Sequence, residues 1–263
     1  MNKRPFFSLV TCTKNSANFV ERNINSVKKQ SCEDYEHIFI DGQSTDDTVG
    51  IIKQYIKQNK RVSFYSCPPK GISNAMNGGI KKARGKYIIH LHSDDWLYDD
   101  DVLRKVKKNL KKLSHPDWIY GKICVREENE DVFGYFPRFK IFKRSSRSIF
   151  SFSLLKYFNF IPHQAVFIKK KVFNNFGLFD ETLSSQMDYD FWLRVVSKTN
   201  WFYVNMIISN FTIRQGAESS SKGNHKKNHN NFKKVQIKHL SKICLFEAKI
   251  LSMILDCYNK IER

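Results

Sequence analysis

Short apolar runs alternate with longer stretches of helical spacing through the first 125 residues of the chain. The apolar runs have strand character and lie at 6–13, 36–40, 62–67, 86–96 and 118–125. The stretches between them carry apolar residues every three or four positions and lie at 17–30, 45–58, 72–84 and 102–113. This alternation predicts βαβ units, and therefore an α/β fold whose mostly parallel sheet is flanked by helices.

Two details of the helical stretches make sharper predictions. In the first stretch, Phe19, Ile24 and Val27 are expected to face the core. The third stretch is followed by Gly85, whose freedom at positive φ predicts a C-terminal helix cap.

The alternation breaks after residue 125. Segment 137–164 is dense in basic and aromatic residues and contains no glycine, which predicts a partly amphipathic connection. A compact αβ segment resumes with AVFIKKKVFNNFGLFDE, MDYDFWLRVV predicts the start of a helix, and NWFYVNMIISNF predicts a pair of strands. The tail is rich in Lys and Asn from His225 and then becomes helical. Its apolar face consists of Leu240, Ile243, Cys244, Ile250, Ile254 and Ile261.

Charge and cysteine content narrow the possible partners and compartment. The formal charge of +20 and the pI near 9.7 predict an anionic partner, which leaves nucleic acid, an anionic membrane surface or a nucleotide substrate. The six cysteines form no CxxC pair and no metal-finger spacing, as expected in a reducing compartment. The chain has no signal-like segment and no apolar run of about 18 residues, so we expect a cytoplasmic protein, attached at most to a membrane surface.

Two adjacent carboxylates, Asp94 and Asp95, end the apolar run KYIIHLHSDDW. The carboxyl end of a buried strand is where open α/β sheets bind ligands, and hard oxygen ligands suit Mg²⁺ or Mn²⁺ carrying a phosphorylated substrate. The alternative is that SDD caps a helix beginning near Asp99.

Polar residues also follow two other predicted strands, at Thr11 to Asn15 and at Asp41. Strand ends on one edge of a parallel sheet lie close together, so these groups can converge on one ligand. Asp41 could accept from a base N–H, although a simple turn aspartate is the alternative. The sequence contains neither GxGxxG after a strand nor GxxxxGK[ST], which argues against a dinucleotide dehydrogenase or a P-loop NTPase.

Five motifs occur in order: TCTKN, HIFIDGQSTDDT, KGISNAMNGGIKKARGKYIIHLHSDDW, PHQAVFIKK and GLFDETLSSQMDYDFWLR. In this arrangement the chain resembles glycosyltransferase family 2, the inverting enzymes of Rossmann-like GT-A fold, over roughly residues 5–215. It is most similar to bacterial members that assemble O-antigen and capsular polysaccharide. The resemblance implies a GT-A domain at 1–215, with a nucleotide-sugar half at 1–125 and an acceptor half at 126–215. A basic C-terminal helical extension follows at 216–263.

The resemblance also implies roles for individual residues. Asp41 becomes the uracil contact, Asp46 part of the nucleotide-binding turn, and Asp188 the catalytic base. Asp94 and Asp95 become the DXD-type element that meets ribose and a metal-bound diphosphate, with Mn²⁺ or Mg²⁺ as the cofactor. Asp95, together with Asp94, is expected to hold the metal. Further nucleotide-sugar contacts are expected from Thr11, Asn15 and Asn77.

Two positions depart from the family pattern. His92 stands where an aspartate often begins the DXD element, and Met187 replaces an acidic residue before the base. Asp188 could instead stabilise the start of its helix, and Asp190 is a competing base. On the acceptor side we expect His163, Gln164 and Asp190, although a lone histidine after Pro162 is usually a hydrogen-bonded turn residue. His225 and His229 are either solvated tail residues or a source of a third metal ligand.

The function expected from the resemblance is inverting, metal-dependent transfer of a hexose from a UDP-sugar, UDP-Glc or UDP-Gal. The acceptor would be a sugar linked to undecaprenyl diphosphate in O-antigen, lipopolysaccharide or capsule biosynthesis. A carboxylate base would deprotonate the attacking hydroxyl, and the metal would neutralise the leaving diphosphate. A non-catalytic nucleotide-sugar-binding partner and a nucleic-acid-binding protein are the alternatives. Aspartates at the strand ends would repel nucleic-acid phosphates, so no nucleic acid is expected.

The basic residues predict contact with an anionic membrane surface, on the cytoplasmic face of the bacterial inner membrane. Cations and rings alternate along 138–160, and the C-terminal helix adds Lys233, Lys234, Lys238 and Lys242 beside its apolar stripe. The alternative is a solvated face and a helix that packs on the domain. The first cluster consists of Arg138, Lys140, Lys143, Arg144 and Arg147, then Phe150, Phe152, Tyr157, Phe158 and Phe160.

Overall fold

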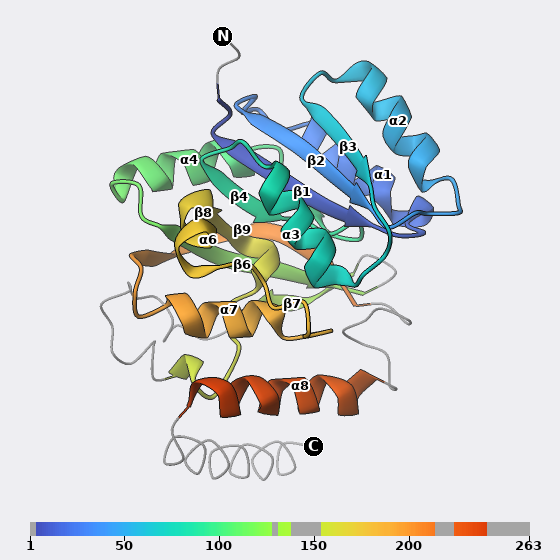
Figure 1. Cartoon of the computed structure of the whole chain (residues 1–263). Coiled ribbons are helices and arrows are strands. Elements are labelled where there is room, and N and C mark those ends of the chain that lie inside the picture. The colour runs from blue at the N-terminus through green and yellow to red at the C-terminus, as the bar shows by residue number, and fades with distance from the viewer. Residues whose placement is uncertain (1–3, 128–130, 138–153, 214–223, 241–263) are drawn as a thin grey trace.

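The computed structural model describes residues 4–127, 131–137, 154–213 and 224–240. Its first half alternates strands and helices, as the sequence pattern predicts (Figure 1). These elements are β1 (Phe7–Thr13), α1 (Ala17–Lys28), β2 (Tyr35–Asp41), α2 (Thr48–Gln58), β3 (Val62–Ser66), α3 (Ile72–Lys82) and β4 (Tyr87–His90). The strands pair in parallel in the order β3-β2-β1-β4.

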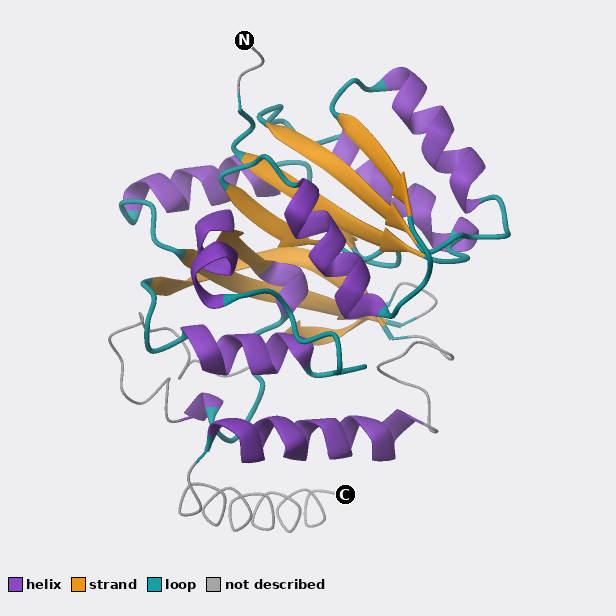
Figure 2. Ribbon diagram, in the orientation of Figure 1, coloured by secondary structure: helices purple, strands orange, loops and turns teal. Residues whose placement is uncertain are grey.

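The second half extends the same sheet and makes it mixed. Its elements are β5 (Trp96–Leu97), α4 (Val102–Lys112), β6 (Trp118–Arg126), β7 (Val132–Phe136), the 3₁₀ turn η2 (His163–Ala165), β8 (Val166–Lys169), α6 (Lys170–Phe176), α7 (Met187–Val195), β9 (Trp201–Thr212) and α8 (Asn224–His239). The sheet continues from β4 in the order β8-β6-β9-β5, with β7 beside β6. Strand β8 is antiparallel to both of its neighbours, whereas β6 and β9 are parallel. The sheet is therefore a curled mixed sheet flanked by helices (Figure 2).

Register within the parallel half brings the strand ends to one edge. Thr13 at the end of β1 pairs with Asp41 at the end of β2, and Asp41 pairs with Ser66 at the end of β3. His90 at the end of β4 lies opposite Val10, so the loop after β4 runs beside the last residues of β1. Chain segments that carry chemistry-bearing side chains therefore meet at this edge.

The core lies on both faces of the sheet. On one face, Trp118 stacks between Trp192 and Trp201, with ring centroids 5.3 and 5.1 Å away. All three rings are at most 2% exposed. Burying a large side chain contributes on the order of 1.5–3 kcal/mol, so this stack ties α7 firmly to β6 and β9.

Helix α1 buries Val20, Ile24 and Val27, which lie four and three positions apart on one face. Phe19 is only partly buried because it flanks this face, so the prediction that it faces the core is wrong in detail.

Gly85 does not cap a helix at positive φ. Helix α3 ends at Lys82, and among the described glycines positive φ is found at Gly71 and Gly177. A Cβ on Gly85 would lie 2.6 Å from the backbone nitrogen of Ser8, so the glycine is needed for close approach of two backbones. The Gly85 N–H donates to the Ser8 hydroxyl, which itself donates to buried Glu36.

Other sequence predictions differ from the structure in the second half. Segment 200–211 belongs to one twelve-residue strand, β9, and not to a pair, because it pairs with β6 along its length. The Lys- and Asn-rich stretch is itself helical from Asn224. Positions 138–153 and 241–263, which hold most of the predicted basic and apolar membrane features, lie outside the described residues.

Helix α8 packs on α7 through one face. Phe232 stacks on Tyr189 with centroids 4.9 Å apart, and Val235 is 1% exposed. The Asn231 amide donates to the hydroxyls of Ser184 and Ser185, 3.0 Å away in each case. The described part of the C-terminal extension therefore packs on α7 (Figure 1). Within the described ranges, no helix has both the length and the apolar composition to cross a membrane.

Candidate functional site

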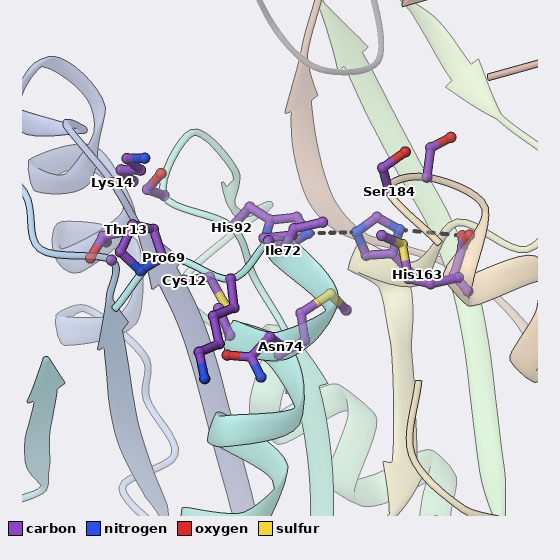
Figure 3. Close-up of a pocket in the computed structure, with 18 of the residues that line it drawn as sticks. Cys12, Thr13, Lys14, Pro69, Ile72, Asn74, His92, His163 and Ser184 are labelled. Carbon is purple, nitrogen blue, oxygen red and sulfur yellow. Dashed lines mark hydrogen bonds and ion pairs between the residues drawn. The ribbon is translucent and has the colours of Figure 1, made fainter. Parts of the chain in front are cut away.

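A cleft of about 620 Å³ opens where the carboxyl ends of β1, β2 and β4 face the N-terminus of α7. One wall comes from the loops after β1, β2, β3 and β4 and from the start of α3. The opposite wall comes from η2, from the loop before α7 and from α8 (Figure 3). Residues separated by more than 100 positions in the chain therefore share one cavity.

The first wall combines cations with a helix start. Lys14 and Lys70 are exposed and line the cleft, as do Gly71 and Ile72 at the N-terminus of α3. Gly71 precedes the helix at φ 94° and, as a glycine, has no side chain to cap the first turn. Backbone N–H groups at an uncapped helix start attract anions. This wall is suited to phosphate groups.

Several residues predicted to bind the nucleotide lie inside the structure. Thr11 is fully buried, and its hydroxyl donates to the Leu91 carbonyl at 2.8 Å. The Asp41 carboxylate is also fully buried and accepts from Thr13, at 2.9 Å, and from the hydroxyl and N–H of Ser44. Neither residue lines the cleft. Asp41 has the contacts of the turn aspartate that the sequence left as an alternative.

Asn15, Asp46 and Asn77 also bind other parts of the chain. Asn15, at φ 48°, accepts from the Thr45 N–H. Asp46 accepts from Thr48 and from the Ala17 N–H, and the Thr48 hydrogen bond above all lowers its pKa. These two residues join the loops after β1 and β2 and lie just beside the cleft lining.

Asn77 belongs to a second connection, between α3 and segment 179–181. Its amide donates to the Phe179 carbonyl at 3.0 Å and to Glu181 at 2.9 Å. Its oxygen accepts from the Phe179 N–H at 3.0 Å. Asn77 is 2% exposed and does not line the cleft, so its contacts in this structure join the two halves of the chain.

The loop after β4 divides its two carboxylates. Asp94 is partly exposed and lines the cleft, whereas Asp95 is 1% exposed and lies outside the lining. The amide of Asn23 donates to the Asp95 carbonyl at 3.0 Å and to the His92 carbonyl at 2.8 Å, and these bonds hold the loop. Helix α4 begins only at Val102 with Asp101 before it, so the SDD sequence is not its N-cap.

Asp188 faces the cleft from the first turn of α7. Its Oδ2 accepts from the Asn159 amide at 3.2 Å and lies 3.4 Å from Nδ1 of His163, while its Oδ1 accepts from the Tyr189 N–H at 2.8 Å. Burial alone raises the pKa of Asp188, but the contact with His163 and the other hydrogen bonds outweigh it and lower the net pKa below the ordinary value. The carboxylate is therefore ionised at neutral pH.

His163 also contacts His92. The two Nε2 atoms are 2.8 Å apart, and Figure 3 draws this contact together with the one from His163 to Asp188. Burial, followed by the charge of His163, lowers the pKa of His92 to about 4, so His92 is neutral at pH 7. Gln164, the other predicted acceptor contact, lines the cleft and is 7% exposed.

Asp190 points away from the cleft toward α8. It is fully buried, and its carboxylate lies 2.9 Å from both Lys238 and His239 and 3.1 Å from Arg194. Burial raises the pKa of Asp190, but His239, Lys238 and Arg194 together lower it below the ordinary value. Residues two apart on a helix face apart, which explains why Asp188 and Asp190 have different surroundings. In the structure Asp190 anchors α8.

Other residues that line the cleft were not predicted as ligand contacts. They include Lys14, Lys70, Asn159, Ser184, Ser185, Gln186 and Asn228. Lys14 lies inside the TCTKN motif and Lys70 begins KGISN, so the motifs could have indicated these two lysines as cleft residues. Asn228 comes from α8 and had no such signal, because only packing brings that helix to the cleft. His229 is exposed and does not line the cleft.

Curated proteins with similar sequences are glycosyltransferases. A PGL/p-HBAD biosynthesis glycosyltransferase of Mycobacterium bovis is 27% identical over 211 residues, which are 79% of this chain and 77% of that protein. A hyaluronan synthase of Pasteurella multocida is 28% identical over 239 residues, and these cover 87% of this chain but 23% of the synthase.

Solved structures share the fold at lower identity. Residues 1–349 of Staphylococcus aureus TarS, in complex with UDP-GlcNAc, match with a TM-score of 0.69 and 20% identity, covering 87% of this chain and 65% of that one. The mannosyltransferase PcManGT from Pyrobaculum calidifontis, with GDP-Man and Mn²⁺, matches with a TM-score of 0.59 and 14% identity, covering 82% and 59%.

The family model described as Glycosyl transferase family 2 matches residues 8–175, which include β1 to β4, the Asp94 loop and His163. With this match over more than half of the sequence, the chain belongs to glycosyl transferase family 2 and is a glycosyltransferase of GT-A-like fold.

Proposed function

We propose that this glycosyltransferase moves a hexose from a UDP-sugar, UDP-Glc or UDP-Gal, to a sugar linked to undecaprenyl diphosphate in O-antigen or capsule biosynthesis. One observation carries the proposal: Asp94 and Asp188, from opposite walls, line the same cleft. The first half, 1–125, then holds the nucleotide sugar and residues 126–215 hold the acceptor. The proposed reaction inverts the anomeric centre in one displacement.

The donor's diphosphate is proposed to lie along the first wall. Lys14, Lys70 and the start of α3 offer positive charge there, and Asp94 lines the same wall from the loop after β4. Developing charge on a leaving diphosphate is stabilised best by groups already fixed in place. TarS solved with UDP-GlcNAc supports a uridine nucleotide, whereas PcManGT solved with GDP-Man shows that this fold also accommodates guanosine nucleotides.

A divalent cation, Mn²⁺ or Mg²⁺, fits the donor set of this cleft. Among the residues that the structure describes, no three His, Cys, Asp or Glu side chains form a cluster able to hold a metal. Mg²⁺ in nucleotide enzymes is commonly held by one or two carboxylates plus substrate phosphates, which requires no such cluster. Asp94 would hold the ion directly, and Asp95, buried behind it, would support the loop. When bound, the ion supplies Lewis-acid neutralisation of the diphosphate.

Asp188 is proposed as the catalytic base. It is ionised, held through both oxygens, and 13% exposed at its side chain, so an acceptor hydroxyl can approach it. The surrounding neutral polar groups, Asn159, Gln164, Ser185 and Asn228, suit the hydroxyls of a sugar. This acceptor wall was expected to include Asp190, but the ion pairs of that residue assign it to α8.

The test is sugar transfer by purified protein with Mn²⁺, a panel of UDP-sugars and lipid-diphosphate GlcNAc or GalNAc. EDTA is expected to stop transfer and added Mn²⁺ to restore it. Asp94→Asn should raise the Mn²⁺ concentration needed for half-maximal rate by about tenfold or more. Asp95→Asn is its matched control. This change should act by destabilising the loop after β4. Full activity of Asp94→Asn in EDTA would refute the metal site. UDP binding without turnover would favour a non-catalytic partner.

Attachment to the cytoplasmic face of the inner membrane is part of the proposal. On α8, Lys227, Lys233 and Lys234 are exposed beside Ile237, which is 67% exposed, while Lys238 is paired with Asp180 and Asp190. Each cation near an anionic surface is worth about 1 kcal/mol. Sedimentation with anionic vesicles should fall with salt and with charge reversal of Lys233 and Lys234. Equal binding to neutral vesicles, or salt-dependent retention on nucleic acid, would count against it.

A further inference from the structure

Three side chains from three separate elements form a line of polar contacts that ends on Asp188. His92 lies in the loop after β4, His163 opens η2, and Asp188 lies in the first turn of α7. The His92 and His163 Nε2 atoms are 2.8 Å apart, and His163 Nδ1 lies 3.4 Å from the Asp188 Oδ2. The line runs from the proposed donor wall to the proposed base (Figure 3).

With both histidines in their neutral forms, the hydrogen-bonding capacity of each group fixes the direction of the line. An ionised carboxylate only accepts, so Nδ1 of His163 must carry the proton in its contact with Asp188. In a neutral imidazole the other nitrogen is then an acceptor, so Nε2 of His163 accepts a hydrogen bond from a neighbouring group. Nε2 of His92 occupies that place and is therefore the donor.

We propose that His92 is a positioning residue for the catalytic base: its Nε2–H fixes the tautomer and ring orientation of His163, which in turn fixes the Asp188 carboxylate. The inference rests on the proposed role of Asp188 as base. It gives a function to the one residue at which this chain departs from the DXD pattern, since an aspartate at position 92 would have no N–H to donate.

The surroundings of His163 explain why a hydrogen bond from His92 matters. His163 is 23% exposed at its side chain, so without a partner at Nε2 its ring could exchange protons with solvent and populate the other tautomer. Asp188 also receives the Asn159 amide at 3.2 Å and the Tyr189 N–H at 2.8 Å. Those two bonds hold the carboxylate in place but do not hold the ring of His163 against it.

Two variants at position 92 separate the hydrogen bond from mere packing. His92→Leu removes the donor, whereas His92→Gln keeps an N–H that can reach His163. We expect kcat for transfer to fall about 10–100-fold in His92→Leu, the range found when an orienting hydrogen-bond partner is removed, and to recover in His92→Gln. The Kd for the UDP-sugar should stay within about twofold in both, because Lys14, Lys70 and the start of α3, which are proposed to hold the diphosphate, are unchanged.

Nitrogen-15 spectra of the histidine side chains test the same hydrogen bond without turnover. The signals of His163 are assigned by their loss in His163→Gln. In the wild type His163 should be in the Nδ1–H form, and in His92→Leu a population of His163 in the Nε2–H form should appear as well. His163 in the Nε2–H form in the wild type would overturn the proposal. Unchanged kcat in His92→Leu, equal losses in both variants, or a weaker donor Kd would do so as well. If the wild type transfers no sugar, the spectra still decide the hydrogen bond, so the two failures are distinguishable.

Discussion

The same substitution at Asp188 and at Asp190, two residues apart, should separate chemistry from stability. Asp188→Asn keeps the size of the side chain and removes the acceptor for a hydroxyl proton. General-base catalysis contributes about 10²–10⁴-fold, or roughly 3–5 kcal/mol of the barrier. We therefore expect kcat to fall by about 10²-fold or more, while the Kd for the UDP-sugar stays unchanged.

Asp190→Asn should act mainly on folding. Asp190 is fully buried against Lys238, His239 and Arg194. Removing one partner of a buried ion pair costs about 3–5 kcal/mol. Lys238 is 49% exposed at its side chain and can be hydrated after the loss, so about 2–3 kcal/mol is the reasonable figure here. That corresponds to a fall in Tm of about 4–6 °C for a chain of this size.

The assay combines single-turnover transfer, isothermal titration of the UDP-sugar and thermal unfolding on both variants. Each variant is the control for the other, because the chemical change is the same. The reverse ranking, with turnover lost in Asp190→Asn and kept in Asp188→Asn, would refute the reasoning and move the base to Asp190. A loss of donor affinity in Asp188→Asn would place that residue on the donor side.

Acid should destabilise the fold through two buried histidines. Burial lowers the pKa of His37 and of His90 to about 3, so between that value and 6.5 the unfolded chain binds more protons. The free energy of unfolding measured in urea should therefore fall by roughly 1.4 kcal/mol per histidine from pH 7.5 to 5.5. His37→Phe should remove the contribution of one histidine to this fall. An unchanged pH dependence in His37→Phe would contradict this. Phe232→Ala should lose the stack on Tyr189 and about 2–3 kcal/mol of α8 docking, seen as faster amide exchange in α8. The exposed Lys233→Ala is its control, and equal exchange in both would contradict the docking role.

The alternation of strands and helices was readable from the sequence because burial on both faces of a parallel sheet forces apolar runs. Asp94 and Asp188 were found as candidate residues, and both line the cleft. Thr11 and Asp41 stay predicted nucleotide contacts, although neither lines the cleft in this structure. Side chains alternate across a strand, and a polar residue near a strand end gives no sign of which face it takes. Here Thr11 satisfies a buried carbonyl, while its neighbour Cys12 lines the cleft.

A helix at the position of α8 could not be predicted from the sequence, for a different reason. Its composition is polar and basic, and intrinsic propensity favours no helix there over a coil. Its stability comes from partners far away in the sequence: Phe232 against Tyr189, and Lys238 with His239 around Asp190. A pattern search along one segment does not detect contacts of that kind.

The strand order has a consequence for how the chain is made. Strand β8 lies between β4 and β6, and β9 lies between β6 and β5, so strands from before and after residue 126 are interleaved in one sheet. During synthesis from the N-terminus, the apolar edges of β4 and β6 stay open until residues 166–169 have left the ribosome. At roughly 5–20 residues per second, about 80 residues separate β4 from β8, and the delay is on the order of 4–16 s. A ribosome-bound chain ending near residue 130 should therefore recruit chaperones, and neither half should fold when expressed alone.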